Sequence, residues 1–447
     1  MVTIITSIAN YLLIILGTIY TLSCFTVFKP SNQNRKEQIL NRQIIYMLLF
    51  HFLCYFILLL RTENFKTIMF YGVQTCFIGI YLFLYHKAYK DASRLISNNM
   101  CFLLVISFIM LTRLSFDLAI KQFAIVVACT AICSVIPWIL KKLKALSAFG
   151  ILYGIAGLLL LGSVFVFGVT KYGATNWISV AGISLQPSEF VKILFVFFVA
   201  SMLAYSNSFR QVVITTVIAG IHVLVLVLEK DLGAALIFFM VYLIMLFVAT
   251  GNYFYFFGGM AGGSLAAFLA YKLFPHVQVR VVAWQNPWPL IDNKGYQITQ
   301  SLFAIGTGGW FGMGLAQGMP NSVPVVETDF IFSAIVEELG GIFGFCVILI
   351  CVSCFVLFLD VAMRSKKMFP KLLSLGFGAV YIFQVFLSIG GATKFIPSTG
   401  VTLPLVSYGG SSVLSTLIIF QVIQGLYIAV EQAKTLESQQ MEVTNEG

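Results

Sequence analysis

Long apolar runs, separated by short polar segments, occupy most of the chain. Each run is long enough for a helix to cross the hydrocarbon core of a bilayer, which takes about 20 residues. The runs fall at roughly 3–27, 43–60, 67–85, 101–116, 122–140, 148–168, 187–205, 211–228, 231–249, 254–273, 329–359, 370–390 and 408–430. This pattern predicts an all-α polytopic membrane protein with about 13 transmembrane helices. The run at 329–359 is longer than a span requires, so we expect its first part at or outside the membrane surface.

Charged residues are rare and mostly basic. Of the 447 residues, 60% are hydrophobic and 10% are charged, and the net charge is +10. In a soluble protein that charge would suggest a nucleic-acid partner. Here the basic residues gather in loops, as they do on the cytoplasmic side of membrane proteins. Four basic loops, which begin at Lys29, Lys87, Lys141 and Arg364, would all lie on one side.

This charge pattern predicts an N-terminus outside the cell and a C-terminus in the cytoplasm. Four basic residues run against it, because they would lie outside: Arg61, Lys66, Arg113 and Lys121. The polar tail from Glu431 to Gly447 is expected to be cytoplasmic and disordered.

Three polar segments would then share the outer side of the membrane. The longest, His276–Gly340, is rich in Gly and aromatic residues, and the other two are Val169–Gln186 and Gly391–Gly410. Loops of such length are usually functional or disordered, and the aromatic content argues against disorder. The sequence therefore predicts a site assembled from several loops on one face of a helical bundle.

Ionisable residues at the edges of apolar runs cost free energy unless they are paired, so each suggests a function. Glu189 and Lys192 stand three residues apart, on one helix face. One interpretation is an ion pair in the first turn of a helix that begins at Pro187, and the other is that Lys192 presents its charge in an outward cavity. Asp231 is expected to cap the helix that follows it, and Asp329 can be a helix N-terminal acid.

Five stretches together resemble a known family. They are Asn176-Trp177 with Gln186-Pro187-Ser188-Glu189-Phe-Val-Lys192; Lys230-Asp231-Leu232-Gly233-Ala234; Gly295-Tyr296-Gln297-Ile-Thr-Gln300-Ser301; Thr328-Asp329-Phe-Ile-Phe with Glu337-Glu338-Leu-Gly340; and Gly400-Val-Thr-Leu-Pro404-Leu-Val-Ser407-Tyr408-Gly409-Gly410-Ser411-Ser412. Their order and spacing resemble the SEDS proteins (shape, elongation, division, sporulation) FtsW, RodA and SpoVE, over roughly residues 100–432.

The resemblance implies a ten-helix core over residues 99–432 with a large extracellular loop at 274–328. Residues 1–98 would add three N-terminal helices, and residues 433–447 a cytoplasmic tail. The implied activity is that of a peptidoglycan glycosyltransferase in the bacterial cell membrane. It polymerises lipid II, releases undecaprenyl pyrophosphate and works with a class B penicillin-binding protein, in elongation, division or sporulation.

The resemblance also implies a catalytic carboxylate, and here the chain departs from the family pattern. The family has Asp at the position of Leu290, and Asp292 follows two residues later. In an extended loop, residues two apart point the same way and lie about 6–7 Å apart. Asp292 is therefore the predicted general base, with Asp329 or Glu327 as alternatives.

The residues predicted to bind substrate are Arg280, Lys192, Glu189, Gln297, Gln300, Asp329, Ser407 and Ser411. Arg280, Lys192 or a divalent cation (Mg²⁺ or Mn²⁺) can stabilise the leaving pyrophosphate. Two other functions stay open: a flippase or transporter for a polyprenyl-linked sugar, which intramembrane charges would suit, and a non-catalytic scaffold for a penicillin-binding protein, which Leu290 favours.

Overall fold

The computed structural model describes residues 2–30, 32–171, 174–180 and 183–446. Within these residues, 13 helical stretches are long and apolar enough to cross a membrane, which confirms the predicted number of spans. The helices that form all or most of each stretch are α1 (Val2–Thr26), α2 (Gln33–Thr62), α3 (Phe65–Ala88), α4 (Arg94–Leu114), α5 (Phe116–Cys133), α8 (Gly150–Phe167), α9 (Pro187–Tyr205), α10 (Phe209–Leu228), α11 (Leu232–Thr250), α12 (Tyr253–Leu273), α15 (Ile331–Arg364), α16 (Met368–Ala392) and α17 (Gly410–Glu446).

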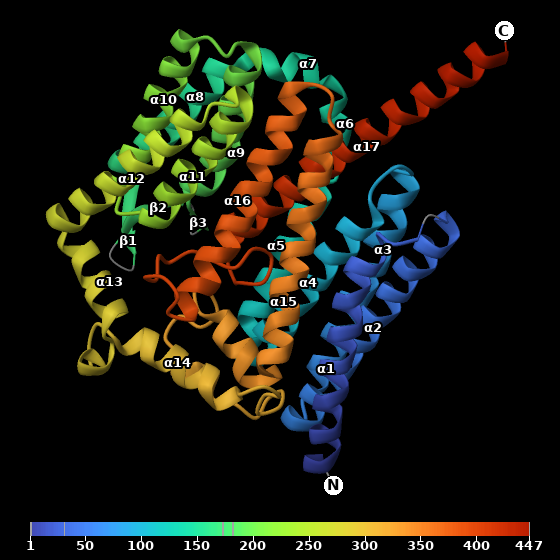
Figure 1. The fold of residues 1–447 in the computed structure, drawn as a ribbon. Helices are drawn as coiled ribbons and strands as arrows, with labels where there is room; N and C mark the ends of the chain where they lie inside the picture. Colours follow the sequence, from blue (N-terminus) through green and yellow to red (C-terminus); the bar gives the residue numbers. More distant parts are fainter. Residues whose placement is uncertain (1, 31, 172–173, 181–182, 447) are drawn as a thin grey trace.

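The first three helices form a layer against one side of the bundle (Figure 1). Helix α1 packs on α2 and α15, and α2 packs on α3 and α4. Polar contacts join this layer to the rest of the molecule: the Tyr20 hydroxyl donates to Asn99 Oδ1 (3.1 Å), and Asn99 Nδ2 donates to Ser353 Oγ (3.2 Å). Side-chain hydrogen bonds of this kind join helices inside a membrane, where apolar burial alone gives little preference between lipid and protein.

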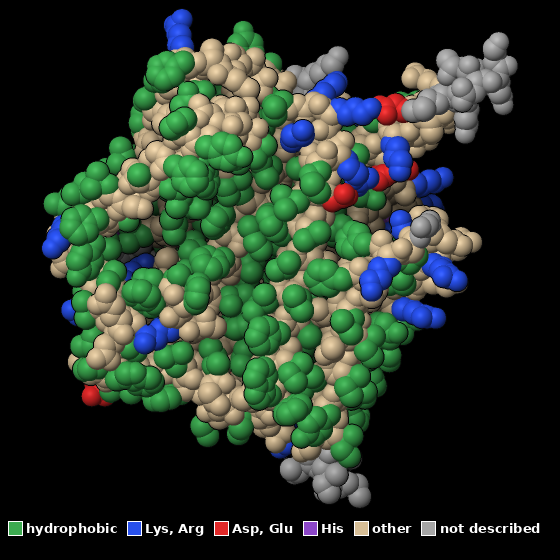
Figure 2. Space-filling model, viewed as in Figure 1, with side chains coloured by type: hydrophobic (Ala, Val, Ile, Leu, Met, Phe, Trp, Pro, Cys, Tyr) green, Lys and Arg blue, Asp and Glu red, His purple; other side chains and the backbone are tan. Residues whose placement is uncertain are grey.

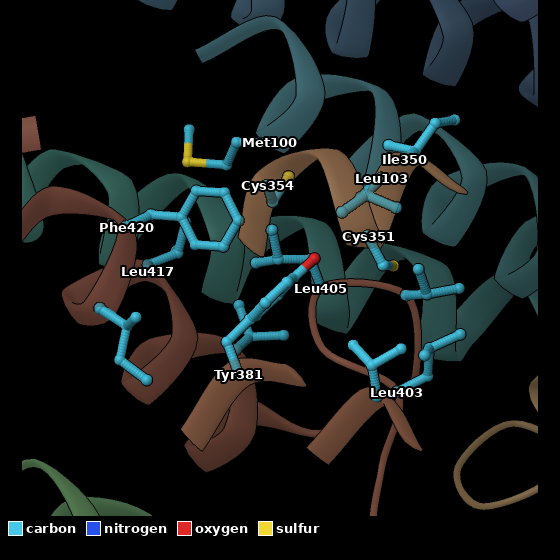
Figure 3. Close-up of a cluster of buried hydrophobic side chains, with 14 of the residues drawn as sticks. Met100, Leu103, Ile350, Cys351, Cys354, Tyr381, Leu403, Leu405, Leu417 and Phe420 are labelled. Atoms are coloured by element: carbon cyan, nitrogen blue, oxygen red, sulfur yellow. The ribbon is translucent and has the colours of Figure 1, made fainter. Parts of the chain in front are cut away.

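The centre of the bundle lies where α4, α15, α16 and α17 meet. In α4, 94% of the most apolar 18-residue stretch is buried, because the N-terminal helices cover its outer face. Figure 3 shows the apolar cluster at this junction, with Leu103 of α4, Cys354 of α15, Tyr381 of α16 and Phe420 of α17. Leu405, from the loop between α16 and α17, lies in the same cluster and anchors that loop to the core.

Helix α15 is broken at Gly340, and this break explains why the apolar run at 329–359 is longer than one span requires. Gly340 has a φ of +87°, and a Cβ there would lie 2.4 Å from the Trp310 carbonyl oxygen. The preceding loop pairs with the break, since Gly341 N–H donates to Gly309 O (2.8 Å) and Met313 N–H to Glu337 O (2.8 Å). The first turns of α15 therefore belong structurally with the polar segment before them, and their place relative to the membrane surface stays a prediction.

Two local expectations are corrected, and the structure adds detail to the long loop. An all-α chain is not fully correct, because β1 (Gly168–Lys171), β2 (Ala174–Val180) and β3 (Ile183–Leu185) form an antiparallel sheet in the order β1-β2-β3. The long loop contains two helices and two short 3-10 turns: α13 (Pro275–Gln285), η3 (Trp288–Leu290), α14 (Tyr296–Gly308) and η4 (Pro320–Ser322). The tail expected to be disordered continues α17 to Glu446, with Glu431 paired to Arg364.

Short helices join α5 to α8. They are α6 (Ile136–Ile139), η1 (Leu140–Lys142), α7 (Leu143–Leu146) and η2 (Ser147–Phe149). Figure 2 shows a largely hydrophobic face, with many Lys and Arg side chains near the end of the molecule where α17 projects. The orientation of the chain in the membrane stays a prediction. The predicted loop Val169–Gln186 includes residues 172–173 and 181–182, which lie outside the described residues.

Candidate functional site

A cavity of about 280 Å³ lies where all three polar segments of the chain meet. Its wall comes from the small sheet, the turn between α10 and α11, helices α13 and α14, the segment before α15, and the loop between α16 and α17. These segments are far apart in the sequence. The prediction of a site built from several loops is therefore matched by one cavity that all of them line.

Asp231 holds one wall of the cavity together. Its Oδ2 accepts hydrogen bonds from Asn176 Nδ2 (3.0 Å), Gln186 Nε2 (3.1 Å) and Ser188 Oγ (3.1 Å). Its Oδ1 accepts from the backbone N–H of Ala234 (3.1 Å), so the predicted cap of α11 is confirmed. With its acceptor positions used in this way, the Asp231 carboxylate fixes the sheet and two helix ends against each other, and it is poorly suited to accept a substrate proton.

The first turn of α9 adjoins this wall. Pro187 stands in the first turn, as predicted, and Lys192 Nζ lies 2.7 Å from Glu189 Oε2 and 2.8 Å from Gln384 Oε1. Lys192 is buried and is not among the residues that line the cavity. Of the two interpretations that the sequence left open for Lys192, the structure supports the ion pair with Glu189.

Gln384 connects that buried ion pair to Thr402 and Ser412, which form the part of the cavity wall that we call the cavity floor. Its amide Nε2 donates to Thr402 O (3.2 Å) and to Ser412 Oγ (3.3 Å), and both of those residues line the cavity. Glu189 and Lys192 therefore support the floor from beneath. A buried, fully paired network of this type makes a surface rigid.

Ser407 acts as a clamp for the loop between α16 and α17. Its Oγ donates to Thr328 O (2.5 Å) and accepts from the backbone N–H of Leu403 (2.9 Å). Tyr408 N–H donates to Glu327 O (2.8 Å) beside it. These bonds join the loop to the segment before α15, so Ser407 holds two cavity walls in register and does not itself line the cavity.

Arg280 and Trp284 fasten α13 to the same loop. Arg280 Nη1 donates to Ser398 O (3.4 Å), and Trp284 Nε1 donates to Lys394 O (3.1 Å). Because α13 begins at Pro275, whose fixed φ suits the first turn, the chain can bend away from α12 and start a new helix there (Figure 1). One face of α13 lines the cavity. Arg280 lines the cavity with its guanidinium still able to make further bonds.

The charges of the cavity are mainly positive. Lys230, Arg280 and Lys294 line it, against the carboxylates of Asp231 and Asp329. Such a lining favours an anionic ligand, with the field concentrated by the surrounding low-dielectric protein.

Asp329 is the cavity carboxylate that the wall network leaves available. Burial raises its pKa to about 6, with Glu327 adding to the effect, while a hydrogen bond from Thr328 and the charge of Arg280 act in the opposite direction. A carboxylate with a pKa near neutrality is suited to exchange a proton at the pH of a cell.

The remaining residues that were predicted to bind substrate or act in catalysis fall into two groups. Gln297 and Ser411 line the cavity, and Ser411 Oγ also accepts from the backbone N–H of Gln186 (3.2 Å). Gln300 and Asp292 do not line it, and Asp292 is exposed. Nothing in the structure assigns a catalytic role to Asp292, which stays a prediction.

The extended geometry assumed for the Asp292 segment is wrong. Trp288–Leu290 form a 3-10 turn, and both Asn293 N–H (3.0 Å) and Gly295 N–H (2.9 Å) donate to Leu290 O. Gly295 is required there, since a Cβ would lie 2.5 Å from Pro287 O. In this compact turn, residues two apart no longer share a direction, so Asp292 does not replace an acid at Leu290 by a simple shift along the chain.

Sequence reasoning missed two of the three cavity cations. Lys230 has a positive φ of 63°, in a two-residue turn before α11, and Lys294 lies in the turn before α14. Lys230 was visible in a motif, yet a lysine between two apolar runs also fits a solvated turn. Only the approach of α13 and α14 to the α10–α11 turn shows that these charges share a cavity.

The described residues do not fit a metal site held by the protein. They contain no group of three or more His, Cys, Asp or Glu side chains placed to hold an ion. Within the cavity, Asp231 already accepts hydrogen bonds on both oxygens. The divalent cation therefore stays a prediction, and no chemical step is derived through it.

Glu229 is buried beside the cavity wall, and neither of its carboxylate oxygens has a hydrogen-bond partner among the described residues. Burial raises its pKa to about 8, and the nearby Asp231 charge adds to the effect. The folded protein therefore holds a proton that the unfolded chain releases at a lower pH. The Glu229 contribution to stability is fully present at low pH and is lost as the pH rises from about 5 to 8.

We expect Glu229→Gln to remove this part of the pH dependence. The difference between wild type and variant should change by about 1.4 kcal/mol for each pH unit between roughly 5 and 7.5, in favour of the variant as the pH rises. The measurement is thermal unfolding of the detergent-solubilised protein across that range. Glu37→Gln, at an exposed position, is the matched control. Parallel curves for wild type and Glu229→Gln would contradict a protonated Glu229.

Comparison with known proteins places these features in context. Residues 93–432 match the cell cycle protein family FtsW/RodA/SpoVE. The peptidoglycan glycosyltransferase RodA of Mycobacterium bovis is 35% identical over 310 residues, which are 64% of this chain and 65% of that relative's length. The probable peptidoglycan glycosyltransferase FtsW of Aliivibrio salmonicida is 33% identical over 287 residues, which are 61% of this chain and 70% of the relative.

A solved structure shares the fold. It comes from work on the coordination of polymerisation and crosslinking by a peptidoglycan synthase complex, and its matching chain has a TM-score of 0.65 at 23% identity. The match covers 76% of this chain and 99% of the other. Since the family match begins at residue 93, the first three helices lie outside it.

Proposed function

We propose, from the premise that this chain belongs to the FtsW/RodA/SpoVE family of multi-pass bacterial membrane proteins, that it is a glycosyltransferase that polymerises lipid II into glycan strands. The observation that carries the proposal is the cavity itself. It combines three cations, suited to a pyrophosphate, with a carboxylate whose pKa is raised to about 6.

The chemistry needs a base and a place for developing negative charge. A sugar hydroxyl oxygen attacks the anomeric carbon of the donor, and its proton passes to a carboxylate. The bond from that carbon to the pyrophosphate breaks, and the electron pair leaves on the phosphate oxygen. Lys230, Arg280 and Lys294 are the groups that we assign to that oxygen, because charges held in place stabilise a developing anion without having to reorganise.

We assign the general base to Asp329 in preference to Asp292. Asp329 lines the cavity that also holds Arg280, whereas Asp292 is exposed on a turn outside the cavity lining. A base has to reach the hydroxyl that it deprotonates within hydrogen-bonding distance, or through one water molecule. Gln297 and Ser411 also line the cavity and supply neutral donors for the sugar hydroxyl groups.

Glu189, Lys192 and Ser407 are assigned as positioning residues. They hold the cavity floor and the loop between α16 and α17, through the bonds to Gln384, Thr328 and Leu403 described above. Gln300, half-buried on α14, has no assigned contact with the cavity.

A class B penicillin-binding protein is the proposed partner. The structural neighbour was studied as part of a peptidoglycan synthase complex that couples polymerisation to crosslinking. A polymerase that makes uncrosslinked strands needs a transpeptidase near its product. The proposal covers elongation, division and sporulation alike, and the product side would face away from the cytoplasm.

The test of the function uses the full chain, purified in detergent with and without its penicillin-binding partner, and fluorescently labelled lipid II. We expect glycan strands on a gel, and we expect Asp292→Ala to polymerise at close to the wild-type rate because the residue lies outside the cavity lining. A complete loss of polymerisation in Asp292→Ala would instead support the base that the sequence alone predicted.

A scaffold for the penicillin-binding protein is the second candidate, and Leu290 favours it. Wild-type protein that forms no strands even with its partner, but gains the activity in Leu290→Asp, would establish the scaffold. Movement of labelled lipid II across vesicle membranes in the absence of strand formation would instead support a flippase. Met313→Asp, which also adds an acid outside the cavity lining, is the control for Leu290→Asp.

A further inference from the structure

A second cavity, of about 870 Å³, lies far along the bundle from the first. It is a groove between α3 and α5, closed at the back by α17, and we call it the α3–α5 groove. One wall belongs to the three N-terminal helices and the other to the part of the chain that matches the family. The groove therefore exists only because the N-terminal layer is present.

The walls of the α3–α5 groove are apolar and open to the side. Ile80 and Leu84 of α3 are 58% and 55% exposed, and Val135, after α5, is 49% exposed. These side chains lie on stretches apolar enough to span a membrane, so the space beside them is lipid and not water. An apolar groove that opens to lipid in this way is suited to hydrocarbon chains.

Polar groups inside the groove are directed at the protein. The Tyr85 hydroxyl donates to Gln421 Oε1 (2.7 Å), and the Tyr89 hydroxyl donates to Ser134 O (2.8 Å). Their rings therefore present carbon to the groove. A ligand in the apolar part needs no hydrogen bonds, which a lipid tail satisfies and a peptide backbone does not.

One end of the groove is cationic. Lys87, Lys90 and Lys141 line it and are exposed, and the Asp91 carboxylate there accepts from Gln432 Nε2 (3.0 Å). Trp138, 59% exposed, lies at the same end. Lysines with a Trp at the end of membrane-spanning helices mark the headgroup region of a bilayer, and basic pockets between helices there bind anionic lipid headgroups.

We propose that the α3–α5 groove is a binding site for an anionic glycerophospholipid, with its acyl chains between α3 and α5 and its phosphate at Lys87, Lys90 and Lys141. The lipid joins the N-terminal helices to the rest of the bundle at a place where protein packing leaves a gap. The argument is one of complementarity: hydrocarbon walls match the tails, and three lysines match a negative headgroup. It is independent of the reaction proposed for the outer cavity.

The test is native mass spectrometry of the full chain after exchange into detergent with phosphatidylglycerol or phosphatidylcholine at equal concentration. We expect retained phosphatidylglycerol on the wild type. In Lys87→Gln/Lys90→Gln/Lys141→Gln its apparent affinity should fall by about tenfold or more, since each lysine near the surface contributes to the attraction. The matched control is Lys29→Gln/Lys36→Gln/Lys367→Gln, which removes three lysines that do not line the groove.

A second variant tests the hydrocarbon part without changing charge. Ala131 lines the groove and is exposed, so Ala131→Phe should fill the groove without overpacking the core and should also lower phosphatidylglycerol retention. Thermal unfolding of each variant in lipid-free detergent identifies any loss of fold. Equal retention of the two lipids on the wild type, or equal phosphatidylglycerol retention on all variants, would overturn the proposal. A co-purified helical peptide or second copy of the chain, displaced by Ala131→Phe, would also overturn it.

Discussion

Replacing Asp329 by Asn is expected to lower the rate of glycan polymerisation by roughly 10²- to 10⁴-fold, the usual contribution of a positioned general base. Asn has nearly the same shape as Asp, but its amide cannot accept the proton of the attacking hydroxyl. Because burial outweighs the favourable charge of Arg280 and raises the pKa of Asp329, the substitution should leave thermal stability unchanged or slightly higher.

The pH profile gives a second readout of the same assignment. The base works only when ionised, so the wild-type kcat/KM should rise as the pH passes upward through about 6 and then level off. The residual activity of Asp329→Asn should lack that rise. The measurement is the initial rate of labelled lipid II polymerisation between pH 5 and 8, with binding of lipid II measured in parallel.

Two outcomes would contradict this assignment. Asp329→Asn could retain the wild-type rate while Asp292→Ala loses it, which would return the role to Asp292. Alternatively, both variants could retain the rate, which would leave Glu327 as the remaining alternative named from the sequence. The backbone carbonyl of Glu327 accepts a hydrogen bond from Tyr408 N–H, and Glu327 does not line the cavity, so the structure favours it least.

The second large effect is expected at Arg113. Its Nε lies 2.8 Å from Glu338 Oε1, and the Glu338 side chain is fully buried. Arg113 Nη2 also donates to Gly318 O (3.1 Å), and the second Glu338 oxygen accepts from Ala316 N–H (3.1 Å). The pair therefore ties α4 to the broken start of α15 and to the Gly-rich segment between α14 and α15.

Arg113→Ala should destabilise the protein by roughly 3–5 kcal/mol, because it leaves a buried carboxylate without its counter-charge. The expected observation is a clearly lower thermal midpoint of the detergent-solubilised protein, together with loss of polymerisation at 37 °C. Arg113→Ala/Glu338→Gln should recover part of the stability, since it removes the unpaired charge. Arg61→Ala, which removes an Arg that hydrogen-bonds Thr6, is the control for the loss of an arginine from the N-terminal half.

An Arg113→Ala midpoint equal to that of the wild type would show that the ion pair contributes nothing net. A double variant no more stable than Arg113→Ala would show that the lost packing of the Arg113 stem, and not the charge, is the cause. Either result would also weaken the view that this pair holds the segment between α14 and α15.

Much of the fold could be predicted from local pattern. Each span is recognisable as a run of about 20 apolar residues. Helix starts such as those at Pro187 and Asp231 follow from local chemistry that needs no tertiary contact. The Gly340–Gly341 pair weakens a helix locally, but the sequence pattern alone does not show that the helix breaks there. The break is set by the pairing of the chain around Gly309 and Met313 with the start of α15.

The candidate site was predicted less completely. Arg280, Asp329 and Ser411 were named from sequence and do share a cavity, while Lys294 was not named as a site residue. Asp292 was chosen by assuming an extended chain, and the 3-10 turn at Trp288–Leu290 removes that assumption. A turn's geometry depends on the fit of Gly295 against Pro287, which spacing in the sequence does not show.

The sequence by itself determined the class of protein, the number of spans, the polar segments that could carry chemistry, and the family resemblance that the comparisons confirm. These properties depend on neighbouring residues and on solubility in lipid, so they can be read along the chain. The tertiary structure alone decided which charges meet. It buried Lys192 against Glu189 and brought Lys230, Arg280 and Asp329 to one cavity, because the environment of a charge is set by segments that pack there from distant parts of the chain.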